Sequence, residues 1–139
     1  MKPIKQVLVT GGAGYVGGVS VEAILDAGHQ VVVLDDLSTG HAENLPADVD
    51  LVVGSVADAE CVAGAMDGIE AVFHEGARGS VARSVEDPLT TDTMNTHGTL
   101  TVLVHPNTGQ ELEDHRDRPL WIGKSQTLKP SIFTDPPKE

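Results

Sequence analysis

The sequence predicts an α/β protein built on a parallel β-sheet with helices on both faces. Three observations predict this class. Short runs rich in Val, Leu and Ile alternate with helical stretches, which is the pattern of parallel strands joined by crossover helices. A glycine-rich turn separates the first apolar run from the first helix, and an acidic pair ends the second run. Right-handed crossovers between these elements give the strand order 3-2-1-4, the first part of a doubly wound sheet.

The first strand is expected over residues 6–10, and a glycine-rich turn follows it. Within that turn Gly12, Gly14 and Gly17 have the spacing G-x-G-x-x-G, and the overlapping stretch also fits T-G-x-x-G-x-x-G. In such a unit the first glycine allows a tight turn, the second lets a pyrophosphate approach the backbone, and the third lets helix and strand pack closely. The pyrophosphate would lie at the free N–H groups of a helix that begins near Tyr15. The alternative is a turn of this kind that holds no ligand.

The second strand is expected over residues 30–34, after a helix that stops at Gly28, a residue type common at helix C-termini. The strand ends in Asp35 and Asp36, and Asp35 lies 18 residues after Gly17. This is close to the spacing of about 20 residues at which an acid binds the adenosine ribose in dinucleotide sites. An acid here favours NAD over NADP, because a 2′-phosphate would meet a like charge.

The later elements follow a polar loop rich in turn-forming residues. They are a strand over residues 50–54, a helix over 58–66, a strand over 69–74 and helical stretches over 80–104. Asp58 is expected to cap the helix that follows it, and Pro88 is expected at the start of the longer helical stretch near the end of this region.

Residues 105–139 differ in composition from residues 1–104. They hold five of the eight prolines and show neither strand alternation nor a helical stripe. We expect a dinucleotide-binding half-domain over residues 1–104 and an irregular or disordered tail over residues 105–139. The strand at residues 69–74 would then form an open edge of the sheet, where self-association or aggregation is expected unless the tail covers it.

Composition limits the classes of function. The chain has 139 residues, of which 40% are hydrophobic and 22% charged, and its formal net charge is −12. Nucleic acids and anionic membranes attract clustered Lys and Arg, so neither is an expected partner. No apolar run has the length of a membrane span and the N-terminus lacks the apolar core of a signal peptide, which predicts a cytoplasmic location. The six histidines lack metal-ligand spacing, so no metal site is expected.

Four segments together resemble a known family. They are VLVTGGAGYVGG, VLDDLSTGH, VFHEGA and SVEDPLTTDTMNTHGTL, and their order and spacing are similar to the N-terminal half of extended short-chain dehydrogenases/reductases. Within that group the chain resembles most closely the NAD-dependent epimerase/dehydratase family, and in particular its UDP-glucose 4-epimerases. The resemblance covers about residues 4–104. It implies a partial Rossmann fold with NAD as the cofactor.

The resemblance also implies where the cofactor lies. The pyrophosphate would lie beside the glycine turn, the ribose beside the acid of the second strand and the adenine after the third strand. The nicotinamide half would lie along the loop His74 to Gly79, after the fourth strand. The residues so implied are Gly11, Gly14, Tyr15, Val16, Gly17, Asp35, Asp36, Leu37, Ser38, Thr39, Gly40, Ser55, Val56, Glu75, Gly76, Ala77 and Asn95. Ser55, Glu75, Gly79 and Thr96 differ from the residue types that the family usually has at these positions.

The catalytic residues of the family have no match in this chain. The family uses a Tyr-x-x-x-Lys pair, whose Tyr removes a proton from a substrate hydroxyl while hydride passes to NAD. The single tyrosine here is Tyr15, and the residue four positions later is Val19. The substrate domain, which would bind a nucleotide-sugar, has no match either. We therefore expect an NAD-binding fragment, truncated before the catalytic residues and inactive alone.

Two alternatives remain open at this point. One is a non-catalytic interaction module that pairs through the open sheet edge, with or without a nucleotide. The other is a gene remnant, in which the segment after Val104 comes from a shifted reading frame, because the family pattern stops there in the middle of a helix.

Overall fold

The computed structural model describes residues 3–104 and 120–123. Its centre is a parallel sheet in the order β3-β2-β1-β4-β5. The strands are β1 (Gln6–Thr10), β2 (Gln30–Asp35), β3 (Asp50–Val53), β4 (Ala71–His74) and β5 (Leu120–Gly123). The predicted strand order 3-2-1-4 is confirmed. β1 lies between β2 and β4.

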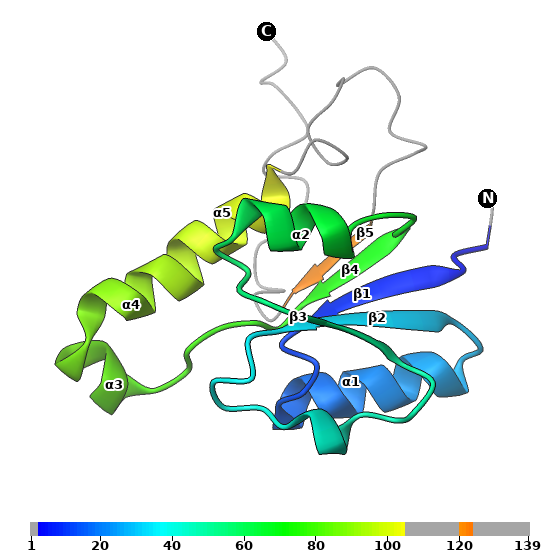
Figure 1. Ribbon diagram of the computed structural model, residues 1–139, viewed down its shortest axis with the longest axis horizontal. Helices are drawn as coiled ribbons and strands as arrows, with labels where there is room; N and C mark the ends of the chain where they lie inside the picture. The colour runs from blue at the N-terminus through cyan, green and yellow to red at the C-terminus, as the bar shows by residue number, and fades with distance from the viewer. Residues whose placement is uncertain (1–2, 105–119, 124–139) are drawn as a thin grey trace, which may run out of the picture.

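Helices cover both faces of this sheet (Figure 1). The long helix α1 (Tyr15–Asp26) lies on one face, whereas α2 (Ala59–Ala65) and α5 (Gly98–Leu103) lie on the other. The remaining helical elements are the 3-10 turn η1 (Ala42–Asn44), α3 (Val81–Glu86), α4 (Pro88–Asp92) and the π-helical turn η2 (Thr93–His97).

The core consists of two apolar clusters, one on each face of the sheet. Val7 and Val9 of β1 pack on the α1 side together with Val21, and Leu8 packs on the opposite side together with Val62. Successive residues of a strand point to opposite faces, so a strand covered on both faces needs an unbroken apolar run. Each fully buried Val or Leu contributes about 1.5–3 kcal/mol relative to an exposed one.

Local signals set the ends of several helices. The Asp58 carboxylate accepts the N–H groups of Glu60 and Cys61 at the start of α2, and these two hydrogen bonds lower the pKa of Asp58 below its usual value. Pro88 occupies the first turn of α4, as predicted. Gly28 follows the end of α1 with φ +88°, a conformation that glycine adopts without strain.

The sheet extends beyond the four expected strands. β5 pairs in parallel with β4, with Ala71 opposite Leu120 and His74 opposite Gly123. The expectation of a tail without strands is therefore wrong at this segment, and β4 is not an edge. A short strand can be fixed by its pairing with a neighbour, so its own sequence need not show alternation. The other residues on which the expectation of an irregular tail falls, 105–119 and 124–139, lie outside the described residues.

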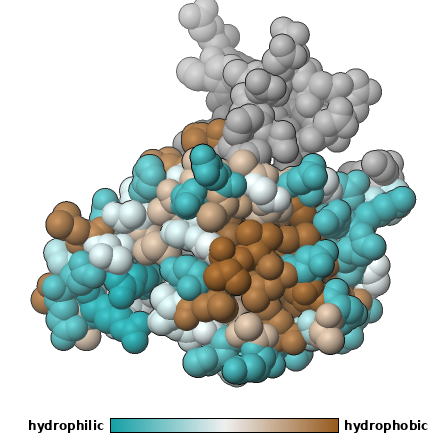
Figure 2. All heavy atoms as spheres, viewed as in Figure 1, coloured by the Kyte–Doolittle hydropathy of each residue, from teal (hydrophilic) through white to brown (hydrophobic). Residues whose placement is uncertain are grey.

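The outer strand on the other side of the sheet is β3. Figure 2 shows apolar side chains gathered in the middle of the view, where β3 lies in Figure 1, and Val53 in this strand is 59% exposed.

Within the part of the chain that the structure describes, no helix has both the length and the hydropathy to cross a membrane.

Candidate functional site

A cleft of about 380 Å³ opens at the carboxyl ends of β1, β2 and β4. Its volume lies within the range of about 300–1,000 Å³ that is usual for ligand pockets. Because β2 and β4 lie on opposite sides of β1, the loops that follow these strands diverge from this point. In open α/β sheets, ligands bind at such a crevice.

The glycine turn after β1 is fixed by close backbone contacts. Gly11 has φ +70°, and a Cβ atom on it would lie 2.8 Å from the backbone of Gly76. A Cβ atom on Gly17 would lie 2.1 Å from the Gly11 carbonyl oxygen, so α1 packs directly on the turn. The left-handed conformation falls at Gly11, the first glycine of the spacing T-G-x-x-G-x-x-G, and not at Gly12, the first glycine of G-x-G-x-x-G. Gly12 instead lies against the side chain of Val33, 2.6 Å from where its Cβ would be.

Gly14 is the N-cap of α1 and leaves room for a ligand. Among the described residues, a Cβ atom at this position would meet only the Gly11 carbonyl oxygen, at an ordinary 3.4 Å. No side chain of that part of the chain caps α1, and its first turn contains no acidic residue. The Tyr15 side chain beside it is 89% exposed. The free N–H groups and the dipole at this helix end suit an anion.

Asp35 ends β2 with its side chain turned inward, and only 8% of the residue is exposed. Its Oδ2 accepts the Ala13 N–H at 3.0 Å, and its Oδ1 accepts the Leu37 N–H at 2.8 Å. The carboxylate is thereby held between the glycine turn and the loop after β2. A carboxylate offers about four acceptor positions, so both oxygens can also accept the hydroxyl groups of a ribose. We call residues 11–17 with Asp35 the glycine wall.

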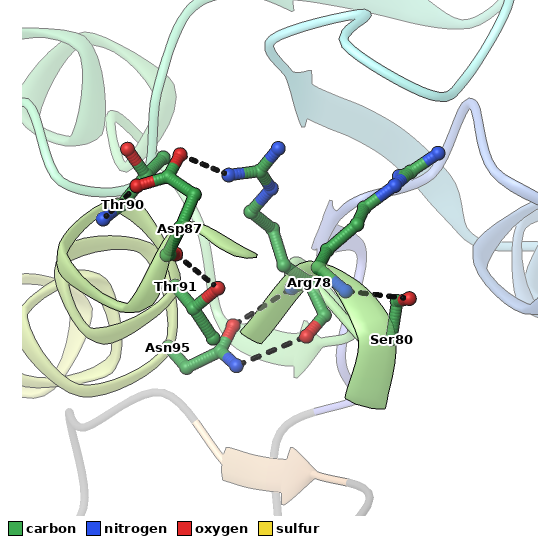
Figure 3. A network of polar contacts seen from close by, with 7 residues as sticks. Arg78, Ser80, Asp87, Thr90, Thr91 and Asn95 are labelled. Atoms are coloured by element: carbon green, nitrogen blue, oxygen red, sulfur yellow. Dashed lines mark hydrogen bonds and ion pairs between the residues drawn. The ribbon is translucent and has the colours of Figure 1, made fainter. Parts of the chain in front are cut away.

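The opposite side of the cleft is the loop of residues 75–80, which we call the β4 wall. Asn95 holds this loop, because its Oδ1 accepts the Arg78 N–H at 2.7 Å and its Nδ2 donates to the Arg78 carbonyl at 3.1 Å (Figure 3). The Arg78 guanidinium lies 3.3 Å from the Asp87 carboxylate. Hydrogen bonds from the Thr90 side chain and backbone, with the Arg78 guanidinium, lower the pKa of Asp87. Helices that follow the loop in the chain thus hold it in place.

His74 lies where β4 meets this wall and contacts two threonines. Its Nδ1 lies 2.7 Å from Oγ1 of Thr10, and its Nε2 lies 2.9 Å from Oγ1 of Thr99. Oγ1 of Thr10 also accepts the N–H groups of Glu75 and Gly76. The end of β1, the end of β4 and helix α5 are therefore joined through side chains.

Most of the residues that the resemblance implied line this cleft. They are Gly11, Gly14, Tyr15, Val16, Gly17, Asp35, Asp36, Ser38, Thr39, Val56, Glu75, Gly76 and Ala77. Leu37, Gly40, Ser55 and Asn95 do not line it. Leu37 and Asn95 act on the cleft through residues that do, since Leu37 binds the Asp35 carboxylate and Asn95 binds the backbone of Arg78.

The loop of residues 74–79, which the resemblance placed along the nicotinamide half, brings Arg78 and Gly79 to the cleft. Sequence reasoning missed the other residues that line it, which are Leu34, Gly54, Ser80, Arg83 and Met94. Arg78 and Arg83 are notable in a chain of net charge −12, because an anionic ligand needs local positive charge. A signal that could have identified Arg83 was its place five residues after Arg78. Among residues 3–104 and 120–123, no group of three or more His, Cys, Asp or Glu could hold a metal ion.

The sequence is similar to known epimerases. The family model described as the NAD dependent epimerase/dehydratase family matches residues 7–108. A UDP-glucose 4-epimerase of Corynebacterium glutamicum is 46% identical over 83 residues, which are 60% of this chain and 25% of that protein.

Solved structures agree with this match. The Thermus thermophilus UDP-glucose 4-epimerase in complex with NAD aligns with a TM-score of 0.70 and 40% identity, over 73% of this chain and 33% of that one. The Thermotoga maritima UDP-glucose 4-epimerase with UDP-glucose aligns with a TM-score of 0.69 and 36% identity, over 73% and 33%. The chain thus spans a quarter to a third of the length of these relatives. From the match over residues 7–108, the chain belongs to the NAD-dependent epimerase/dehydratase family.

Proposed function

We propose that this chain binds NAD in the cleft at the carboxyl ends of β1, β2 and β4. The observation that carries the proposal is the buried Asp35 carboxylate and its hydrogen bond to the Ala13 N–H in the glycine turn. That contact brings an acceptor for ribose hydroxyls next to a turn suited to a pyrophosphate, which is what one ADP moiety requires. The dependence of the family on NAD and the NAD in the Thermus relative support the same ligand.

The orientation of the dinucleotide follows from the two walls. The pyrophosphate would lie at the N-terminus of α1, where Gly14 leaves space. The adenosine half would extend past Asp35 toward Gly54 and Val56, on the β3 side of the cleft. The nicotinamide half would then lie along the β4 wall, close to the two arginines.

NAD is proposed over NADP because of where the charges lie. Asp35 is the last residue of β2, whereas Arg78 and Arg83 follow β4 on the other side of β1. A 2′-phosphate on the adenosine ribose would therefore meet the Asp35 carboxylate and not the guanidinium groups.

We propose no turnover by these 139 residues. Bound NAD supplies a hydride acceptor, but removing a proton from a sugar hydroxyl requires a positioned base. The single tyrosine, Tyr15, lies at the pyrophosphate end of the cleft and has Val19 four residues later. We assign no nucleotide-sugar to this stretch of chain. The Thermotoga relative that holds UDP-glucose has about three times the length that this chain covers.

A calorimetric titration with NAD and NADP tests the proposal, using the wild-type chain, Asp35→Asn and Asp50→Asn. Asp50 lies at the opposite end of the sheet, in β3, so its substitution changes the net charge equally without touching the cleft. We expect saturable NAD binding, weaker NADP binding, and a loss of about tenfold or more in NAD affinity with Asp35→Asn, because hydrogen bonds to charged groups contribute about 1.5–3 kcal/mol.

Two results would contradict the proposal. The first is a folded wild-type chain that shows no saturable binding of NAD. The second is an equal loss of affinity with Asp50→Asn, which would indicate a general effect of charge. Incubation with NAD and UDP-galactose should yield no UDP-glucose, and detectable conversion would overturn the proposed lack of turnover.

The interaction module stays a prediction from the sequence, in a changed form. Pairing through β4 is not proposed, since β5 pairs along that strand. Size-exclusion chromatography of Asp35→Asn would still separate the two functions, because self-association that is independent of the nucleotide should survive the substitution. A cytoplasmic location likewise stays a prediction from the sequence.

A further inference from the structure

We infer that His74 is a neutral imidazole with its proton on Nε2, and that this tautomer makes it a positioning residue for the β4 wall. The inference concerns the chemical state of the side chain and the loop it holds. Only its binding measurement rests on the proposed NAD function.

Thr10 lies at the Nδ1 end of the ring. It is fully buried, and its Oγ1 accepts the Gly76 N–H at 3.0 Å and the Glu75 N–H at 3.1 Å, an N–H that the Thr10 carbonyl also accepts at 3.1 Å. A hydroxyl group has two acceptor positions and one O–H donor. With both acceptor positions used, the contact of 2.7 Å between Oγ1 and His74 Nδ1 must use the hydroxyl proton. Nδ1 is therefore the acceptor and carries no proton.

Thr99 lies at the Nε2 end of the ring, and its hydrogen bonds lead independently to the same assignment. Oγ1 of Thr99 donates its proton to the Asn95 carbonyl at 2.6 Å. Only its acceptor positions then remain for the contact of 2.9 Å with His74 Nε2. Nε2 must carry a proton to form that bond. In the other tautomer both ring nitrogens would face groups of the wrong kind, so two partly buried hydrogen bonds would be lost.

These bonds hold the β4 wall at two points. Thr10 binds the first two N–H groups of the β4 wall. Thr99 lies one helical turn after Asn95, and the Asn95 side chain is hydrogen-bonded to the backbone of Arg78. His74 is the link between these two attachments. The β4 wall is therefore anchored at its start and at its middle through one ring, and a cofactor that lies along the wall depends on both anchors.

The tautomer can be observed directly by NMR in the full chain labelled with ¹⁵N. A long-range ¹H–¹⁵N correlation at neutral pH shows which ring nitrogen carries the proton, and the ring signals of His74 are assigned by correlations through its covalent bonds. The expected pattern is a protonated Nε2 and an unprotonated Nδ1. A proton on Nδ1, or on both nitrogens, would overturn the inference whether or not the chain binds NAD.

The positioning role is tested by two matched variants in α5. Thr99→Val and Thr101→Val each remove a hydroxyl that binds the carbonyl four residues earlier, but only Thr99 contacts His74. We expect Thr99→Val to shift the His74 Nε2 signal, to shift the amide signals of residues 76–79 and to weaken NAD binding about five- to tenfold. Thr101→Val should leave all three nearly unchanged. Thr99→Ser keeps the hydroxyl and should behave as the wild type.

The readouts separate the failure of this inference from the failure of the proposed function. If the wild type binds no NAD, the proposed function fails, and the amide signals of residues 76–79 still decide the positioning role. If those amide signals and the NAD affinity respond equally to Thr99→Val and Thr101→Val, His74 does not position the wall. If Thr99→Val does not fold, two other measurements decide whether the inference holds. They are the tautomer of His74 in the wild type and whether Thr99→Ser behaves as the wild type.

Discussion

The two walls of the cleft are held by different means. In the glycine wall, backbone lies against backbone, since a Cβ on Gly17 would lie 2.1 Å from the Gly11 carbonyl oxygen. In the β4 wall, side chains from later helices hold a loop, as Asn95 holds Arg78 with two hydrogen bonds. The glycine wall therefore tolerates no added atom at Gly11 or Gly17, whereas the β4 wall depends on particular pairs of polar groups. We expect substitutions to act differently on the two.

The largest effect is expected from Gly17→Ala. An alanine would favour the helix, but its Cβ would collide with the Gly11 carbonyl, which is backbone and cannot turn away as a flexible side chain could. We expect a loss of about 3 kcal/mol in the free energy of unfolding, the upper range for overpacking, together with loss of NAD binding. Guanidinium unfolding curves would measure the first.

Gly64→Ala is the control, because it lies in α2 and a Cβ there would have no described atom within 4 Å. It should raise the free energy of unfolding by up to about 1 kcal/mol through helix propensity alone. Similar stability of Gly17→Ala and the wild type would mean that the glycine wall is not as tightly packed as described.

The next effect is expected from Asn95→Ala. It removes both hydrogen bonds to Arg78, each contributing about 0.5–1.5 kcal/mol, so we expect a loss of about 2 kcal/mol, faster amide exchange in residues 75–80 and a roughly tenfold weaker NAD affinity. Asn44→Ala removes one long contact, of 3.4 Å, to the Ala13 carbonyl in the glycine wall. A large effect there would show that side chains also hold the glycine wall, and the contrast would fail.

A smaller effect, of opposite sign, is expected from Glu75→Gln. Glu75 places a carboxylate in a cleft that is to receive two phosphates, and removing one like charge should strengthen NAD binding about two- to fivefold at low ionic strength. Glu86→Gln makes the same change in charge on the exposed surface of α3, outside the cleft. NAD titrations at two salt concentrations should show that the gain in affinity for Glu75→Gln becomes smaller as the salt concentration rises. Weaker NAD binding by Glu75→Gln than by the wild type would mean instead that the Glu75 carboxylate supports the β4 wall.

The smallest effect concerns acid pH and the start of α4. Hydrogen bonds from the Thr90 side chain and backbone, with the guanidinium of Arg78, lower the pKa of Asp87 in the folded state. A lowered folded pKa stabilises the fold above the unfolded value of about 4 and loses that contribution as pH falls through the folded value. The free energy of unfolding, measured at several pH values between neutral pH and about pH 3, should fall less steeply for Asp87→Asn than for the wild type. Identical slopes would show that the pKa of Asp87 does not change on folding.

The same contrast explains how much could be read from the sequence. The glycine spacing, the strand runs and the acid after the second strand obey rules that act within a few residues, and Gly14, Gly17 and Asp35 were predicted from them. The strand order was predicted from the right-handed crossovers, and Tyr15 and Val16 were implied by the resemblance to the family. Arg83 and Met94 in the cleft were missed, because their places depend on how the helical segments after β4 pack in space. The role of Asn95 as a support of Arg78 was also not predicted.

The sequence by itself determined the local backbone: which residues can take φ values that only glycine accepts easily, which runs can be buried on both faces, and where α2 and α4 begin. The tertiary structure alone decided which distant groups meet. Pairing of β5 with β4 covers an edge that the sequence left open, and Thr10, His74 and Thr99 form one chain of hydrogen bonds although they lie up to 89 residues apart. The physical reason is that a hydrogen bond depends on the distance and direction between two groups in space, which sequence separation does not fix.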